Sequence, residues 1–219
     1  MTPQWNFMVD APIRLDRMGA LGSLLASMTD PPGMAKSDGI FPFKQFDTLH
    51  YARFVILHDQ TVDDFKEVGE RIPVYDPILA FFGDCDEPGD AFLAKAAEGR
   101  AGDGLCEIFS HCVDPPSKSN LLAWMKTRSL RPAAAYVNYL GRTVRQIQQE
   151  DRLRDAVIGY LKANPPATDN PQATRRGVID FVSGSDLALP VEAATPSAWR
   201  VWNLIDLLIP FAALAIRSS

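Results

Sequence analysis

Prolines divide the first 165 residues of this chain into short segments, and the apolar pattern of each segment sets the fold class. The chain has 17 prolines in 219 residues, and proline stops regular structure because it lacks a backbone N–H. The prolines at predicted boundaries are Pro12, Pro31, Pro77, Pro115 and Pro165. Because the segments between them have regular apolar spacing, we expect a compact domain and not a disordered chain.

The segments between the prolines follow the order strand, helix, strand, strand, helix, strand. Alternation or β-branched and aromatic content predicts a strand that starts at Trp5 and is ended by Pro12, and further strands over 49–57, 78–82 and 133–140. Three- and four-residue apolar spacing predicts helices over 13–28, 91–112 with an interruption at 99–104, 120–127 and 143–163, with a further short helix near 63–68. Residues 31–47 are predicted to form an irregular loop, and residues 83–89 a turn. This order is typical of an α+β, ferredoxin-like split βαβ sandwich, with an antiparallel sheet, helices on one face and extra C-terminal helices.

A four-stranded antiparallel sheet with two helices on one face leaves its other face bare. An apolar sheet face of that size needs a partner sheet, an added helix or a ligand to cover it. We therefore expect a homo-oligomer or a second homologous domain that closes an α+β barrel. A chain that is one half of a duplicated pair is a further alternative.

The sequence predicts three regions along the chain. Residues 1–164 form the α+β domain, residues 165–196 form a Pro/Ala-rich linker, and residues 197–219 form an amphipathic apolar helix. The apolar stretch Val201–Ile216 measures about 24 Å as a helix, against about 30 Å of hydrocarbon in a bilayer. Asn203 and Asp206 interrupt it. Three locations fit: a bilayer interface reached through 199–217, the bare sheet face or a partner, and the start of a longer span.

Charge and cysteine content limit the classes of binding partner and the cellular compartment that we expect for this chain. The chain has 22 basic and 27 acidic residues, a net charge of −5, and no basic block, so we expect no nucleic-acid partner. Three cysteines and the absence of a secretory pattern at the start predict reduced thiols and a cytoplasmic location, with association at a membrane surface through the C-terminal segment.

Two polar residues in the strand 49–57 are candidates for chemistry. His50 and Arg53 are three residues apart, so regular alternation puts them on opposite faces, with His50 beside Phe54. A His or Arg inside a barrel is a reasonable group for proton transfer or ligand binding. The structural alternative is a hydrogen-bonded His and an Arg that pairs with a carboxylate such as Asp84.

The turn 83–89 carries carboxylates that could suggest a calcium loop. Pro88 and Lys95 occupy the fifth and twelfth positions, which an EF-hand loop reserves for oxygen ligands, so the calcium interpretation fails. Asp86 or Asp90 is a candidate cap for the following helix.

The segment Ser110-His111-Cys112 is a poor nucleophile pair because adjacent helical side chains diverge. No C-x-x-C or other metal-ligand spacing is present, so no metal site is predicted. Cys112 continues the apolar spacing of its helix and is predicted to be buried. His111 is kept as a candidate cofactor-binding residue.

Three stretches resemble an uncharacterised bacterial family over roughly residues 5–162: LHYARFVIL, AFFGDCDEPGDAFL and GLCEIFSHC. Its members carry an LHFARFVVL-like strand and a GL-x-x-I-F-x-HC-like helix. The resemblance implies the dimeric α+β barrel superfamily, which includes the dye-decolourising haem peroxidases, but brings no activity with it.

If the resemblance extends to haem, His50 or His111 would be the axial ligand, although the G-x-x-D-G motif of the peroxidases is absent. We therefore expect a module that acts through association with a partner or a membrane surface. The alternative is an oxidoreductase-like or peroxidase-like barrel that binds a small ligand or haem through His50 or Arg53.

Overall fold

A computed structural model describes residues 4–30, 34–58, 76–131, 142–165, 170–187, 201 and 204–205. The chain divides into two compact units. We call Gln4–Val137 the sheet unit, and we call Asn138–Ser219 together with Met1–Pro3 the helical unit.

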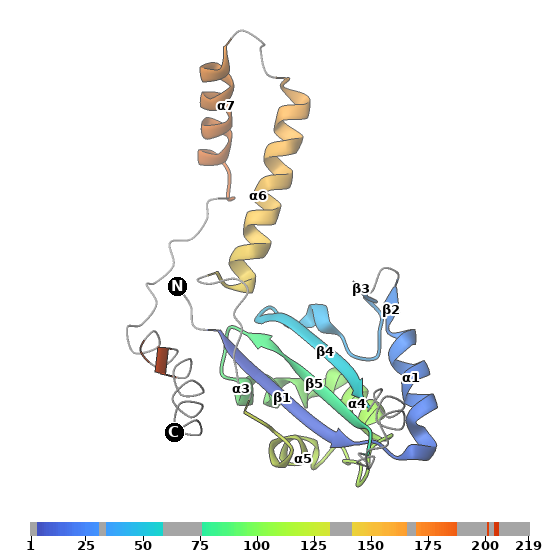
Figure 1. The fold of residues 1–219 in the computed structure, drawn as a ribbon. Coiled ribbons are helices and arrows are strands. Elements are labelled where there is room, and N and C mark those ends of the chain that lie inside the picture. Colours follow the sequence, from blue (N-terminus) through green and yellow to red (C-terminus); the bar gives the residue numbers. More distant parts are fainter. Residues whose placement is uncertain are drawn as a thin grey trace, which may run out of the picture. The chain divides into compact units, whose positions relative to one another are not determined.

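The sheet unit is built on three antiparallel strands in the order β1-β5-β4 (Figure 1). They are β1 (Trp5–Pro12), β4 (Leu49–Leu57) and β5 (Ile78–Cys85). Because β5 is antiparallel to both neighbours, β1 and β4 run parallel to each other, with β5 inserted between them. This arrangement is compatible with a split βαβ unit. The predicted bounds 49–57 are confirmed for β4, and β1 ends at Pro12 as predicted, whereas β5 extends beyond the predicted 78–82.

Short elements connect and cover these strands. They are the 3₁₀ helices η1 (Leu15–Arg17) and η2 (Phe43–Gln45), the small hairpin β2 (Thr29–Asp30) and β3 (Met34–Ala35), and the helices α1 (Met18–Ser27), α3 (Gly89–Ala96), α4 (Gly99–Phe109) and α5 (Leu121–Thr127). The predicted helix 13–28 starts later, after η1. The predicted turn 83–89 also starts later, because Gly83, Asp84 and Cys85 still pair with both neighbouring strands. The predicted short helix 63–68 and strand 133–140 lie outside the described residues.

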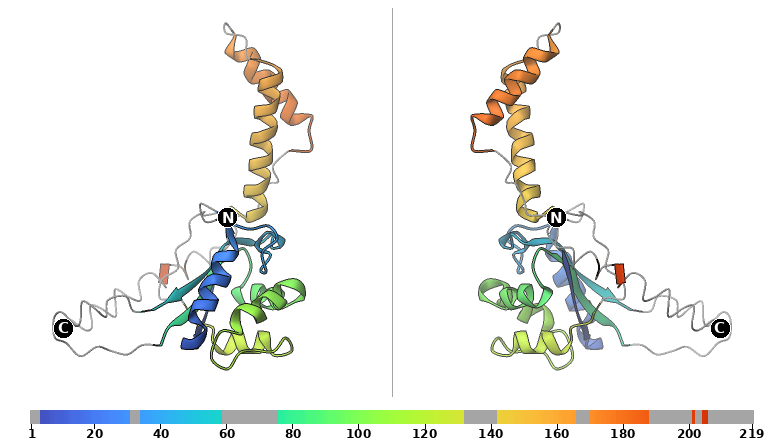
Figure 2. Two further views of the ribbon diagram at one scale, coloured as in Figure 1. Left: turned by 90° about the vertical axis from the view of Figure 1, so that its right-hand side faces the viewer. Right: turned by 90° about the vertical axis from the view of Figure 1, so that its left-hand side faces the viewer.

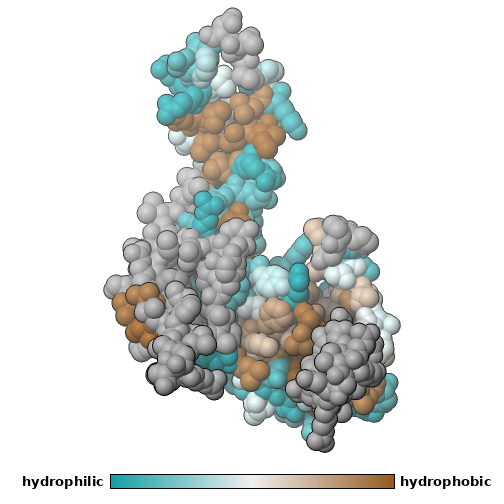
Figure 3. Space-filling model, viewed as in Figure 1, coloured by the Kyte–Doolittle hydropathy of each residue, from teal (hydrophilic) through white to brown (hydrophobic). Residues whose placement is uncertain are grey.

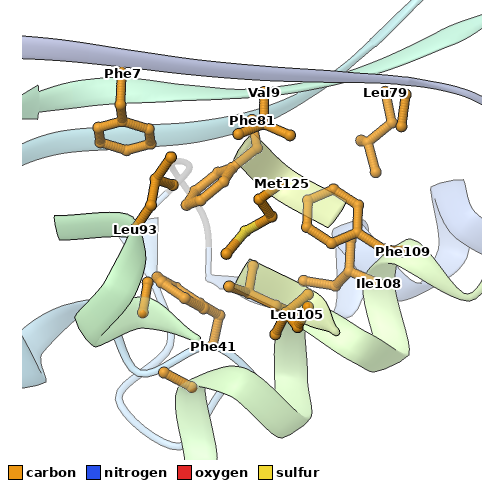
Figure 4. Packing of buried hydrophobic residues seen from close by; sticks show 14 of the residues in the cluster. Phe7, Val9, Phe41, Leu79, Phe81, Leu93, Leu105, Ile108, Phe109 and Met125 are labelled. Atoms are coloured by element: carbon orange, nitrogen blue, oxygen red, sulfur yellow. The ribbon is translucent and has the colours of Figure 1, made fainter. Parts of the chain in front are cut away.

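One hydrophobic core lies between the sheet and the helices. Figure 2 shows α3, α4 and α5 on the same side of the sheet. Strand residues such as Val9 and Phe81 point toward Leu105 and Phe109 of α4 (Figure 4), and all four are 0% exposed. The apolar periodicity of β1 and of α4 therefore correctly predicts which face of each element is buried. The two apolar faces pack against each other.

The predicted irregular loop 31–47 contributes to this core, which its lack of periodicity did not indicate. Phe41 is 0% exposed, and its ring centroid lies 5.7 Å from that of Phe81 and 5.8 Å from that of Phe54. The loop backbone approaches α4 so closely that a Cβ on Gly104 would lie 2.1 Å from the carbonyl oxygen of Ile40. Glycine at this position is what allows the contact.

The helical unit contains α6 (Val144–Ala163) and α7 (Pro171–Ser183). The side chain of Thr143 caps α6 by accepting from the backbone N–H of Gln146 at 3.1 Å. The two helices contact each other through Tyr160 and Phe181, whose rings stack at 4.7 Å. Apolar side chains gather on both helices (Figure 3).

Two predictions about domain organisation differ from this arrangement. The predicted linker 165–196 contains the thirteen-residue helix α7, because Asn170 caps its first turn and Pro171 occupies its first position. The predicted domain 1–164 includes α6, but the units separate between 137 and 138. The reason is that α6 packs against α7.

The broad fold class is α+β, with a small antiparallel sheet and several helices. Among the helices that the structure describes, none has the length and apolar character required to cross a membrane. Of the predicted C-terminal helix 197–219, the described residues are Val201, Leu204 and Ile205.

Candidate functional site

A β-bulge at His50 interrupts the regular alternation of β4. Leu49 pairs with Cys85 and Tyr51 with Asp84, so His50 is the extra residue between two consecutive pairs. Leu49 and Ala52 are three residues apart, yet both pack against the core. The prediction that His50 and Arg53 face opposite sides by simple alternation is therefore wrong, because the bulge shifts the count by one residue.

The bulge brings His50 into a cluster of polar side chains at one end of the sheet. His50 Nε2 lies 2.7 Å from Oδ1 of Asp86 and 2.9 Å from Nε2 of Gln4. Beside this group, the amide Nδ2 of Asn6 donates to Oδ1 of Asp84. The backbone also joins here, since the N–H of Asp86 donates to the carbonyl of Thr48 at 2.8 Å. All three strands contribute to this polar cluster.

The polar cluster is largely shielded from water. The side chains of His50 and Asp86 are 7% and 8% exposed. Nε2 of His50 faces both the carboxylate of Asp86 and the amide nitrogen of Gln4, and the tautomer of the imidazole sets which of these two contacts is its hydrogen bond. Burial raises the pKa of Asp84, although the hydrogen bond from Asn6 and the nearby His50 both lower it. The arrangement orients the imidazole and weakens the tendency of Asp84 to ionise.

The residues after β5 anchor the turn into α3. Thr48 Oγ1 donates to Glu87 at 2.6 Å, and Lys95 Nζ lies 2.6 Å from the other oxygen of Glu87. Burial opposes ionisation of Glu87, but the hydrogen bonds from Lys95 and Thr48 outweigh it, so its pKa is lowered. The predicted capping role is wrong: α3 has Pro88 at its N-cap and no side-chain cap, and Asp86 binds His50 instead.

Arg53 lies on the sheet face opposite the core, away from the residues that bury Phe54. It pairs across the strands with Phe82, and its guanidinium carbon is 5.4 Å from the ring centroid of Tyr51. The sequence alternative paired Arg53 with Asp84, but the carboxylate of Asp84 accepts from Asn6. Arg53 and His50 therefore belong to different groups of contacts.

His111 and Cys112 follow the end of α4. The carbonyl of His111 accepts from the backbone N–H of Arg14 at 3.0 Å, and its Nδ1 is buried with no hydrogen-bond partner. Cys112 is 0% exposed, as its spacing predicted. Burial raises the pKa of Cys112 and of Cys85 to about 12, so neither thiol is a nucleophile near neutral pH.

One ring nitrogen of each candidate haem ligand is accounted for in the fold. Nε2 of His50 lies beside Asp86 and Gln4, and Nδ1 of His111 is buried without a hydrogen-bond partner. In the part of the chain that the structure describes, no group of three or more His, Cys, Asp or Glu side chains is arranged to hold a metal ion.

No family model, curated protein or solved structure matches this chain. The assignment of the site therefore depends on its geometry. Sequence reasoning identified His50 but missed Gln4 and Asn6, whose contacts reach across 46 and 78 residues. The alternation of polar and apolar residues in β1 indicates that Asn6 lies on the face opposite the core, but it does not identify Asp84 as the residue that Asn6 contacts.

Proposed function

We propose that this protein is a ferredoxin-like α+β module that acts by association, and that a second copy packs on the face of its sheet opposite the helices. The strand order β1-β5-β4, with β1 and β4 parallel, supports the ferredoxin-like assignment. Closing two such sheets on each other produces an α+β barrel. The C-terminal segment and a membrane surface are the other candidates for this association.

The observation that carries the proposal is the apolar character of the sheet face opposite the core, which we call the open face. Its side chains come from all three strands and alternate with the core residues, and most are apolar: Asn6, Met8, Asp10, Tyr51, Arg53, Val55, Leu57, Ile78, Ala80, Phe82 and Asp84. Tyr51 is 39% and Leu57 48% exposed. Covering such a face removes apolar area from water, which stabilises the complex by roughly 25 cal/mol per Å².

Sedimentation velocity over a wide range of protein concentration tests the proposal. We expect a dimer for the unaltered chain and a monomer for the double variant Tyr51→Glu with Leu57→Glu, because burying two new carboxylates opposes the contact. The matched control is Leu15→Glu, since Leu15 is 73% exposed on η1 and should leave the dimer intact. A monomeric unaltered chain at every concentration would overturn the proposal.

Association with a membrane surface through 199–217 has one observation in its favour. Val201, Leu204 and Ile205 are 54%, 56% and 38% exposed, and apolar side chains in such positions can insert at a lipid interface. Flotation with vesicles of mixed neutral and anionic phospholipids tests this role. It predicts that the full chain floats and that a chain without residues 199–219 does not; a full chain that stays at the bottom removes it.

An oxidoreductase-like, ligand-binding role for His50 or Arg53 also has one contact in its favour, the shielded pair of His50 and Asp86. A carboxylate that fixes an imidazole in this way is typical of proton-transfer sites. The absorption spectrum of the purified protein tests the haem form of this role. A Soret band that disappears in His50→Gln would support it, and a spectrum without that band removes it.

A further inference from the structure

The open face carries opposite charges on its two outer strands. Arg53 lies on β4, in one row with Phe82 and Met8. Asp10 lies on β1, in the next row of the same face, with Ala80 and Val55. The face therefore has a cation on one side and an anion on the other, with the side chains of β5 between them.

Both charges are available for a partner. Arg53 is exposed and Asp10 is half-buried, and neither forms an ion pair with another residue that the structure describes. Asp84 is the other carboxylate of this face, but it accepts from Asn6, and burial raises its pKa. Arg53 and Asp10 are thus the two charges of the open face whose contacts with a partner would depend most on how that partner is oriented.

Two orientations are compatible with a two-fold dimer that packs this face on itself. If the two-fold axis runs along β5, β4 of each copy lies over β1 of the other, and opposite charges come together. If the axis runs across the strands, β4 lies over β4, and an axis through the row of Arg53 brings the two Arg53 side chains together. Unlike charges attract and like charges repel across an interface, so charge favours the first orientation.

The spacing of sheets allows the first contact. In that orientation Arg53 of one copy lies above the row that contains Met8, and Asp10 is two residues further along β1, about 7 Å away. Packed sheets are about 10 Å apart, so an extended arginine side chain can span the gap at an angle. The contact occurs twice because the two-fold axis repeats it.

We propose that two copies pack with β4 of each over β1 of the other, and that Arg53 of each copy pairs with Asp10 of the other. This inference rests on the proposed self-association through the open face. It makes Arg53 and Asp10 the residues that specify which orientation forms. The hydrophobic side chains between them supply the contact area.

Charge reversal tests the proposed orientation. We expect Arg53→Asp alone and Asp10→Arg alone each to weaken the dimer by about tenfold or more in Kd, because each places like charges together twice. An equimolar mixture of the two variants should recover a heterodimer, and the chain that carries both changes should dimerise again. Lys44→Asp, an exposed position on η2, is the control and should leave Kd unchanged.

Chemical crosslinking gives an independent measurement that does not depend on the affinity of the charge variants. Copies with Arg53→Cys are mixed with copies with Asp10→Cys and treated with a short bismaleimide, because the two positions are too far apart for a direct disulfide, and circular dichroism verifies that each variant is folded. The proposed orientation predicts crosslinks between unlike copies, whereas the alternative predicts crosslinks between two Arg53→Cys copies.

The outcomes separate the two levels of the proposal. Crosslinks between two Arg53→Cys copies, or a dimer that ignores charge reversal but is lost in Tyr51→Glu with Leu57→Glu, would overturn the orientation and keep the self-association. A chain that is monomeric at every concentration would overturn both.

Discussion

The sheet unit and the helical unit both have regular apolar periodicity, but they bury it to very different degrees. In the sheet unit, β1, β5, α3 and α4 each place side chains at 0% exposure in one core. In the helical unit, Val144 is the buried residue of α6, and α7 has none among its described residues. Helical spacing in a sequence therefore predicts a helix but not the depth of its packing, and we expect the stability of the described chain to reside in the sheet unit.

The largest expected effect comes from a core ring of the sheet unit. Phe81 is 0% exposed, and its ring stacks on Phe54 at 4.4 Å. Phe81→Ala leaves a cavity under the sheet, and such changes cost about 3–5 kcal/mol. Urea denaturation followed by circular dichroism should show this loss. Hydrogen exchange of α6 and α7 under native conditions should stay unchanged; faster exchange there would show that the two units share their stability.

A smaller loss is expected where the backbone of the loop meets α4. In Gly104→Ala the added Cβ would lie 2.1 Å from the carbonyl oxygen of Ile40, so the loop or the helix must shift, at a cost of about 1–3 kcal/mol. Gly22→Ala is the matched control, because nothing lies within 4 Å of a Cβ at this α1 position. Equal urea midpoints for the two variants would contradict the close approach.

The helical unit should respond less to the loss of its own aromatic contact. Phe181→Ala removes the ring that stacks on Tyr160 at 4.7 Å, and aromatic pairs contribute about 0.5–1.5 kcal/mol beyond their buried area. We expect faster amide exchange in α7 and an unchanged urea midpoint for the sheet unit. Ile179→Ala, at a position 46% exposed on the same helix, should have a smaller effect, and an effect as large as that of Phe181→Ala would show that the stacked pair is not the main contact.

The smallest effect concerns the ion pair that holds the turn into α3. The pKa of Glu87 is lowered in the folded chain, so its stabilising contribution is present above the unfolded-state pKa and is lost as pH falls through the folded-state value. Glu87→Gln should therefore reduce stability at neutral pH by less than about 1 kcal/mol. Urea midpoints of the two chains should converge in acid, and a constant difference at every pH would exclude an electrostatic origin.

The sequence predicted those parts of the fold that show a local pattern. β4 has its predicted bounds because LHYARFVIL combines aromatic and β-branched residues. Phe41 was missed because it joins the core from a loop without periodicity. The helix α7 was also missed, although the pair Asn170-Pro171 is a typical helix start. The Pro and Ala content of 165–196 is typical of a linker, but the cap at Asn170 starts a helix within it.

The candidate site was predicted only in part, for a different reason. His50 was identified by its residue type, but its orientation depends on the bulge, and a bulge is set by pairing with β5, which no local pattern in β4 reveals. Its contacts with Gln4 and Asp86 join three separate stretches of the chain. Such contacts become visible only once the strand register is known.

The bulge also bears on how this strand tolerates insertion and deletion. Leu49 and Tyr51 pair with the consecutive residues Cys85 and Asp84, so a chain shortened by His50 alone would keep every other side chain of β4 on its present face. His50 is therefore equivalent to a one-residue insertion into an otherwise regular strand. The alternation of β4 does not depend on His50, and this residue contributes an imidazole held against the carboxylate of Asp86 at the end of the sheet.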